Sequence, residues 1–154
     1  MPVTEKKDKA LFILNPTAGV LPFNFLISKD LARRKNELKC LKTLTIDDTG
    51  FLIKDNLDNH NIFIAAGGDG TVHTVASELV GTEKILGVLP LGSGNGFAKE
   101  FGFRMNIRSL LSNIEKGESM DIDVIDINDK LCLNVAGIGL DIFVAHSFSE
   151  LKLR

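Results

Sequence analysis

The segment from residue 62 to residue 80, IFIAAGGDGTVHTVASELV, constrains the fold more than any other part of the chain. It begins with a continuous apolar run, residues 62–66, which is typical of a parallel strand buried on both faces. After a turn, the apolar residues recur with the period of a helix packed on a sheet, at Val72, Val75, Ala76, Leu79 and Val80. The glycine-rich turn of residues 67–71 is therefore expected at the carboxyl end of a buried strand and at the start of a helix.

This turn is a candidate anion site, because the start of a helix leaves backbone N–H groups without partners and carries the positive end of the helix dipole. Its three glycines are expected to allow positive φ angles and the close approach of a phosphate oxygen. Thr71 is expected to cap the helix. A simpler alternative is that Asp69 only forms a turn. The buried strand before the turn and the regular helix after it favour the phosphate site.

Two further apolar runs are followed by turns of small residues. Residues 10–14 lead into NPTAG at 15–19, and residues 84–89 lead into PLGSGNG at 90–96, with a helix expected afterwards. Strands that alternate with helices predict a Rossmann-like α/β domain of three layers with a mostly parallel sheet. Ligands of such sheets bind outside the carboxyl ends of the strands. The turns at 15–19, 67–71 and 92–96 can therefore converge on one ligand.

The other segments of this domain are predicted from weaker patterns. Residues 23–41 are expected to form a helix and residues 42–46 a strand. A break is expected at residues 47–50, with a short helix or loop over 51–56. A further helix is predicted over residues 107–116, ending at Gly117.

The pattern changes from residue 120 onward. Alternating apolar residues flank a turn at residues 128–130 and predict a β-hairpin; they are Ile122, Val124, Leu131, Leu133 and Val135. We therefore expect an α/β domain over residues 1–118 and the incomplete beginning of a β-rich second domain over residues 119–154. Open strand edges tend to pair with another chain, so a homodimer, strand exchange or disorder is expected in the second segment.

Composition limits the class of function. The chain of 154 residues carries 18 basic and 20 acidic side chains, and this balance argues against nucleic-acid binding because no basic excess neutralises phosphates. Cys40 and Cys132 lie far apart and suggest neither a disulfide framework nor a zinc site, which fits a reducing cytoplasm. The apolar run at residues 10–14 is too short for a signal peptide or a membrane span, so an intracellular, soluble protein is expected.

Two common phosphate-binding motifs are excluded. The P-loop pattern G-x-x-x-x-G-K-[ST] does not occur. The dinucleotide fingerprint G-x-G-x-x-G/A fails after GSG at 92–94, where Phe97 stands at the third small position, and after GIG at 137–139, where Ile142 does. A hydride-transfer enzyme is accordingly not expected.

Three motifs together resemble one known family. ILNPTAG, GGDGT and PLGSGNGFAKEF, in this order and at these separations, are similar to the nucleotide-binding domain of the diacylglycerol kinase catalytic family, which includes bacterial lipid kinases and sphingosine and ceramide kinases. The segment DIDVIDINDKLCLNVAGIGLD resembles the beginning of that family's β-rich second domain. NAD kinases and phosphofructokinases share the GGDG turn, but PLGSGN is similar to the lipid kinases.

The resemblance implies ATP-dependent phosphorylation of a lipid hydroxyl, such as that of diacylglycerol or a sphingoid base, with Mg²⁺. It implies that Asp69 is the catalytic or metal-linked carboxylate and that Asp123 matches an acidic position near the metal. The residues implied to hold the nucleotide are Asn15, Pro16, Thr17, Gly19, Gly67, Gly68, Gly70, Thr71, Gly92, Ser93, Gly94 and Asn95. Phosphoryl transfer needs positioning, backbone donors and a divalent cation more than covalent chemistry, which agrees with such a site.

The resemblance also sets expectations about partners and place. The expected partners are a nucleotide and a lipid acceptor at a membrane surface, and the expected location is the cytoplasm, including a peripheral position at the inner membrane face. The chain is expected to be a fragment of a longer enzyme that is inactive or weakly active alone. Two alternatives stay open: a non-catalytic nucleotide-binding or regulatory module, and an NAD-kinase-like kinase.

Overall fold

The protein is described by a computed structural model that covers residues 10–15, 38–42 and 46–150. Two compact units make up the chain, Met1–Ile122 and Asp123–Arg154. The domain boundary that the sequence predicts at residue 118 stays a prediction. Most of the helix predicted over residues 23–41 lies outside the described residues, and its described end, residues 38–41, is wrong because these residues form a strand.

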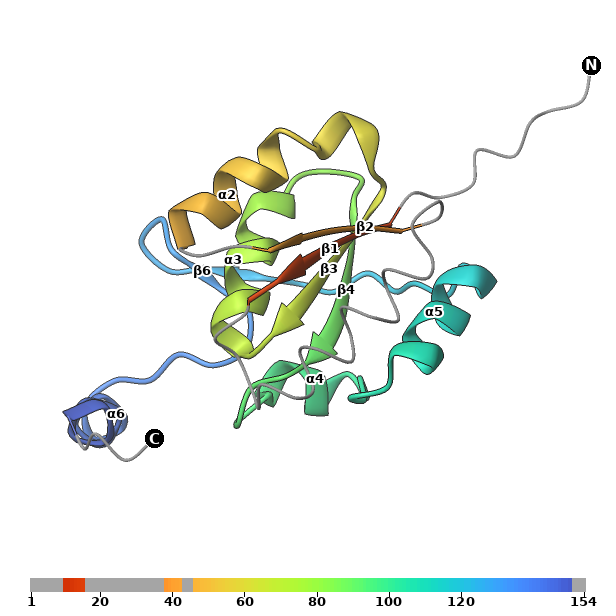
Figure 1. Cartoon of the computed structure of the whole chain (residues 1–154). Helices are drawn as coiled ribbons and strands as arrows, with labels where there is room; N and C mark the ends of the chain where they lie inside the picture. The colour runs from red at the N-terminus through yellow and green to blue at the C-terminus, as the bar shows by residue number, and fades with distance from the viewer. Residues whose placement is uncertain (1–9, 16–37, 43–45, 151–154) are drawn as a thin grey trace, which may run out of the picture. The chain divides into compact units, whose positions relative to one another are not determined.

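Four parallel strands form the sheet of the first unit, in the order β2-β1-β3-β4 (Figure 1). They are β1 (Ala10–Leu14), β2 (Leu38–Lys42), β3 (Ile62–Gly67) and β4 (Ile85–Pro90). Because all four run in the same direction, their carboxyl ends lie at one edge of the sheet. The predicted α/β fold with a parallel sheet is confirmed.

Helices cover both faces of the central strands, which explains why their sequences are continuously apolar. On one face, Phe12, Ile64 and Leu89 form a buried cluster with Leu110 and Leu111 of helix α5 (Ile107–Lys116). The alternate strand residues are buried on the opposite face. There, helix α3 (Asp69–Leu79) packs on β3 and β4, and helix α2 (Ile46–Lys54) packs on α3.

The helical stripe predicted after the glycine turn is confirmed except at its last member. Four of its residues are buried in α3: Val72, Val75, Ala76 and Leu79. Val80 is the C-cap and half of it is exposed. The helix therefore ends one residue earlier than the apolar pattern suggests.

The prediction for residues 42–56 is wrong in two respects. The strand spans Leu38–Lys42 rather than 42–46, because Lys42 pairs with Leu14 at the end of β1 and this non-local pairing fixes the strand ends. The break predicted at residues 47–50 lies inside α2. Two features favour a helix here. Acidic residues in a first helical turn complement the helix dipole. Thr49 and Ile53 are four residues apart, on one side of the helix, and both are buried. A short 3₁₀ helix, η1 (Leu57–Asn59), follows.

Helix α5 is confirmed at both ends of its predicted range. Asn106 is its N-cap, and its Oδ1 accepts hydrogen bonds from the backbone N–H groups of Arg108 and Ser109 at 3.0 and 3.1 Å. Gly117 closes the helix in the left-handed conformation, with φ of 68°. Both ends are thus defined by specific cap residues.

Replacing Asn106 by alanine is expected to lower the free energy of unfolding by about 1 kcal/mol, because two backbone donors lose their acceptor. Urea denaturation of the two proteins measures this difference. Asn106→Asp retains the oxygen acceptor and serves as the control. If Asn106→Ala unfolds at the same urea concentration as the unaltered protein, the cap does not stabilise α5.

The second unit begins with a β-hairpin, as predicted, but its strands are short. β5 (Ile125–Asp126) pairs antiparallel with β6 (Leu131–Cys132). Asn128 and Asp129 have φ of 52° and 62°, as a two-residue hairpin turn of type I′ requires. The hairpin is followed by helix α6 (Leu140–Glu150). The sequence pattern, which predicted a β-rich segment, did not indicate this helix. Within the described residues, no helix has the length and apolar character needed to span a membrane.

Candidate functional site

The glycine turn after β3 lies where the sequence predicts it, but its cap is different. Gly68 is the N-cap of α3, with an extended backbone, and the helix begins at Asp69. Thr71 is the third residue of the helix, so the prediction that it caps the helix is wrong. Its Oγ1 instead accepts a hydrogen bond from Nδ2 of Asn15 at 3.3 Å. Thr71 therefore joins the turn after β1 to the turn after β3.

Gly67 and Gly68 of this turn serve close packing rather than positive φ angles. Among the described residues, the glycines with positive φ are Gly81, Gly102, Gly117 and Gly139, so the predicted conformation of the turn is wrong. A Cβ at Gly67 would collide with the side chain of Thr71. A Cβ at Gly68 would lie 3.3 Å from Cα of Gly92. These positions need glycine because other parts of the site come close to their backbone.

The loop after β4 is closed by the side chain of Asn95. The N–H of Gly92 donates to Oδ1 of Asn95 at 3.0 Å, and Nδ2 of Asn95 donates to the carbonyl oxygen of Gly92 at 2.6 Å. Asn95 itself adopts the left-handed conformation, with φ of 53°. Asparagine is among the few residues that accept this conformation, so residue 95 fixes the shape of the loop.

The two glycine loops touch through their backbones. A Cβ at Gly92 would lie 2.6 Å from Cα of Gly68, so residue 92 has no room for a side chain in its present position, and a Cβ at Gly68 would be a tight contact at 3.3 Å. The N–H of Leu91 donates to the carbonyl oxygen of Gly67 at 2.8 Å, which extends the pairing of β3 and β4 into the loops. The turns at 67–71 and 92–96 therefore form one structure at the edge of the sheet.

Asp69 links these loops through its carboxylate. Its Oδ2 accepts from the N–H of Gly96 at 3.0 Å, and its Oδ1 accepts from the N–H of Phe97 at 3.1 Å. Both donors belong to the first turn of helix α4 (Gly96–Glu100). The carboxylate thus caps a helix that lies 27 residues further along the chain, at the positive end of its dipole.

The backbone N–H groups of Gly96 and Phe97 are functional partners that the sequence prediction missed. The pattern GSGN followed by a helix indicates a turn, but nothing in the residue types shows that a distant aspartate caps that helix. Phe97 is itself buried and contacts the ring of Phe101 in a tilted arrangement, with ring centroids 4.6 Å apart. Its side chain therefore anchors α4 while its backbone holds Asp69.

The remaining predicted site residues divide into three groups. Asn15 is described and meets Thr71, as stated above, whereas Pro16, Thr17 and Gly19 lie outside the described residues. Ser93 and Gly94 are exposed in the loop after β4, and Gly70 is exposed on α3. Asp123 belongs to the second unit, and its place beside a metal stays a prediction.

The donor set suits an anion together with a hard cation. The first N–H groups of α3 and those of the loop after β4 lie at one edge of the sheet, as an anion cradle requires. Each oxygen of Asp69 accepts one hydrogen bond and retains acceptor capacity, so it can bind Mg²⁺ directly or through water. Within the described part of the chain, no three His, Cys, Asp or Glu side chains gather to form a metal site on their own.

A family model for the diacylglycerol kinase catalytic domain matches residues 9–127. The chain is 30% identical over 138 residues to a diacylglycerol kinase of Bacillus subtilis, covering 85% of this chain and 46% of that protein. It is 42% identical over 74 residues to a Klebsiella pneumoniae protein named "Probable lipid kinase YegS-like", covering 47% of this chain and 25% of the relative. The chain thus spans less than half the length of these curated relatives.

The fold is also similar to a solved structure. A crystal structure of a diacylglycerol kinase from Bacillus anthracis str. Sterne superposes with a TM-score of 0.68 at 27% sequence identity. The similarity covers 82% of this chain and 46% of that protein.

Proposed function

The chain belongs to the diacylglycerol kinase catalytic family, and from this premise we propose that it binds ATP with Mg²⁺ and forms the nucleotide half of a lipid kinase. The phosphoryl group would pass from ATP to a lipid hydroxyl, such as that of diacylglycerol or a sphingoid base. The observation that carries this proposal is the joining of two glycine loops through Asp69. Loops joined in this way would hold their backbone N–H donors rigidly, in an arrangement suited to a polyphosphate.

The proposed phosphate contacts come from the backbone. The N–H groups at the start of α3, from Asp69 to Thr71, would bind phosphate oxygens, since a helix start offers both free donors and a favourable dipole. Ser93 and Gly94, exposed in the adjoining loop, would add further N–H donors. Asn95 and Gly92 would act indirectly by holding this loop in shape. Binding of this kind positions the phosphates without covalent chemistry.

Asp69 would organise the metal and its waters. When bound, Mg²⁺ neutralises phosphate charge and supports in-line transfer to the acceptor. Asp69 is held by two backbone donors, so its carboxylate has a fixed direction at the edge of the sheet. This geometry favours a ligand of the metal, direct or through water, over a mobile base. Activation of the acceptor hydroxyl would be a secondary role.

We expect the 154-residue chain to bind ATP with Mg²⁺ weakly and to show little or no lipid phosphorylation. The nucleotide loops are present, whereas the chain covers less than half of the relatives that carry the lipid kinase name. Isothermal titration calorimetry measures the binding, and transfer of labelled phosphate to diacylglycerol measures turnover. Robust phosphorylation by this chain would contradict the proposal that further sequence is needed for the acceptor. It would also exclude a non-catalytic module.

We also expect the second unit to mediate self-association into a homodimer. Large hydrophobic side chains are exposed along residues 135–144, among them Val135 at 84% and Phe143 at 70%. Apolar patches of this kind mark interaction surfaces. Light scattering coupled to size exclusion should show a dimer that Phe143→Asp converts to a monomer. A monomer at every concentration tested would exclude this surface as a dimer interface.

A further inference from the structure

The segment that joins α4 to α5 presents a sharp turn with an apolar tip. The N–H of Asn106 donates to the carbonyl oxygen of Arg104 at 2.7 Å, which closes a three-residue γ-turn with Met105 at its apex. The side chain of Met105 is 58% exposed. Its neighbours Phe103 and Ile107 instead pack against the core cluster under α5. Met105 is therefore held outward by a turn whose two flanks are anchored.

Specific caps fix this turn at both ends. Gly102 has φ of 72°, and the N–H of Phe103 donates to the carbonyl oxygen of Ala98 at 2.8 Å, as in a Schellman motif that ends α4. On the other side, Asn106 caps α5. The turn therefore has little freedom to withdraw Met105 from the surface.

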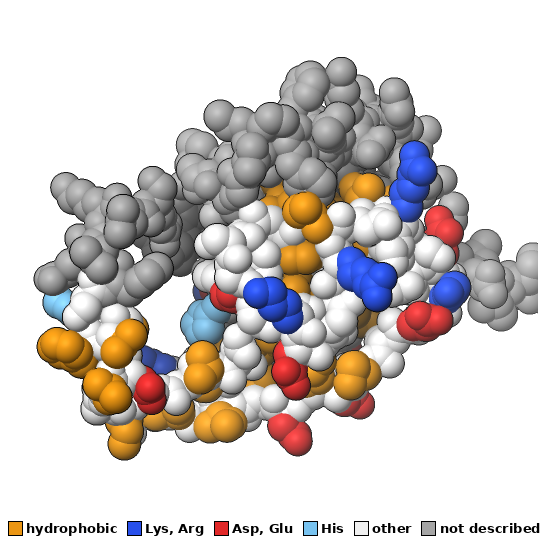
Figure 2. Space-filling view, turned by 90° about the horizontal axis from the view of Figure 1, so that it is seen from below, with side chains coloured by type: hydrophobic (Ala, Val, Ile, Leu, Met, Phe, Trp, Pro, Cys, Tyr) orange, Lys and Arg blue, Asp and Glu red, His pale blue; other side chains and the backbone are white. Residues whose placement is uncertain are grey.

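Basic side chains lie near the apolar tip along the chain. Between residues 99 and 108 the chain carries Lys99, Arg104 and Arg108 but one acidic residue, Glu100, although the protein as a whole has a formal charge of -2. All three basic residues are exposed, and within the described residues no carboxylate forms an ion pair with them. Figure 2, which is seen from below the view of Figure 1, shows Lys and Arg side chains together with hydrophobic ones and with Asp and Glu side chains on this face.

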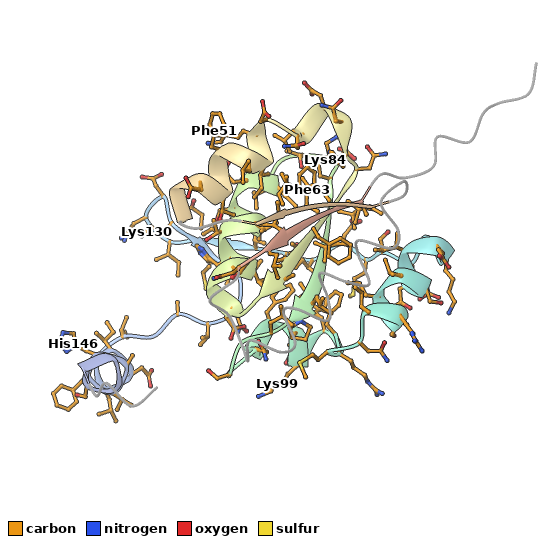
Figure 3. The ribbon with its side chains drawn as sticks, viewed as in Figure 1. Phe51, Phe63, Lys84, Lys99, Lys130 and His146 are labelled. Carbon is orange, nitrogen blue, oxygen red and sulfur yellow. The ribbon has the colours of Figure 1, made fainter. Side chains whose placement is uncertain are left out.

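This surface lies at the same edge of the sheet as the phosphate loops. α4 follows the loop after β4 directly, and α5 starts from the turn and packs back along β4. Figure 3 shows Lys99 pointing away from the sheet at this edge, while Lys84 lies at the opposite end of β4. A membrane that touches the turn would therefore be close to the place where the phosphates are proposed to bind.

We propose that the turn at Arg104–Asn106, with Lys99 and Arg108 beside it, docks the protein on an anionic lipid bilayer. Met105 enters the interface between headgroups and acyl chains, and the three basic residues contact lipid phosphates, a combination that suits peripheral binding. This inference rests on the proposed lipid-kinase function, because it supplies the contact with the bilayer that holds the acceptor. It needs neither nucleotide nor turnover for its test.

Binding is tested by sedimentation of the full chain with vesicles, in the absence of nucleotide. Vesicles of phosphatidylcholine alone are compared with vesicles in which phosphatidylglycerol replaces part of it. Each basic residue near an anionic surface strengthens binding by about fivefold, so the double variant R104E/R108E should bind at least about tenfold more weakly. Lys84→Glu makes the same type of charge change at the opposite end of β4 and should have little effect.

The depth of Met105 can be measured directly because the chain contains no tryptophan. In Met105→Trp the single indole should shift its emission to the blue with anionic vesicles and be quenched by brominated lipid. Phe51→Trp provides the matched control, since Phe51 is 71% exposed on α2, and its emission should not change. Circular dichroism establishes that the variants are folded.

Four outcomes would overturn the docking surface. They are no binding to anionic vesicles, equal binding to both vesicle types, equal loss in Lys84→Glu, or an emission shift at Phe51→Trp but not at Met105→Trp. Equally tight binding to duplex DNA would show a general polyanion site instead. Vesicle binding through the turn without ATP binding would support this inference and refute the proposed function. ATP binding without vesicle binding would refute this inference and support the proposed function.

Discussion

Replacing Asp69 by asparagine is expected to remove most of the binding of ATP with Mg²⁺ and most phosphoryl transfer, while leaving the sheet folded. An asparagine has one acceptor oxygen, so only one of the two N–H groups from Gly96 and Phe97 keeps a partner, and the other faces an NH₂ donor. A hydrogen bond to a charged group contributes about 1.5–3 kcal/mol, and the variant should lose stability on this scale. The start of α4 and the adjoining phosphate loop should loosen.

The functional loss should exceed the loss of stability. Affinity of the chain for ATP with Mg²⁺ should fall at least about tenfold, which corresponds to 1.4 kcal/mol, and phosphoryl transfer by a full-length enzyme with the same change should fall about a hundredfold or more. Calorimetry, a labelled-phosphate assay and urea denaturation measure the three quantities. Asp58→Asn, on the exposed η1 turn, is the matched control. Unchanged affinity and metal dependence in folded Asp69→Asn would show that Asp69 is only structural.

Replacing Gly92 by alanine is expected to separate the two glycine loops. The new Cβ would lie 2.6 Å from Cα of Gly68 and 2.9 Å from Oδ1 of Asn95, so the backbone must move and the closure of the loop must weaken. Overpacking of this kind costs about 1–3 kcal/mol. Nucleotide affinity should fall together with the free energy of unfolding, because the same contact supports both.

Gly70→Ala is the matched control for the stability effect. A Cβ at Gly70 would meet nothing within 4 Å, and the residue lies in the first turn of α3. Alanine is favoured over glycine in a helix by about 0.5–1 kcal/mol, so this variant should be as stable as the unaltered protein or more stable. If Gly92→Ala and Gly70→Ala unfold alike, the contact between Gly68 and Gly92 does not hold the loops together.

The sequence is most informative where local pattern and tertiary structure agree. The apolar runs of β1, β3 and β4 and the stripe on α3 are continuous or periodic over several residues, so their type is readable. Gly117 and the Asn128-Asp129 pair also occupy left-handed positions suited to their residue types. The order of strands and helices then follows from the alternation of these elements, and with it the edge of the sheet where the site lies.

The sequence is least informative where a distant residue decides the local structure. β2 is placed by its pairing with β1, so its four-residue shift cannot be read from its own pattern. The glycines at 67, 68 and 92 indicate a turn, but whether they serve positive φ or close packing depends on Thr71 and on each other. The bond from Asp69 to α4 spans 27 residues and leaves no periodic signal.

The most direct test of the proposed site is a titration of the chain with ATP and Mg²⁺ followed by backbone amide NMR. The amides of Gly68, Gly70 and Thr71 should shift together with those of Ser93 and Gly94, with one common dissociation constant. Amides at the opposite end of β4, near Lys84, should stay in place. If ATP binds but leaves both glycine loops unperturbed, or shifts only one of them, the joined loops are not the nucleotide site.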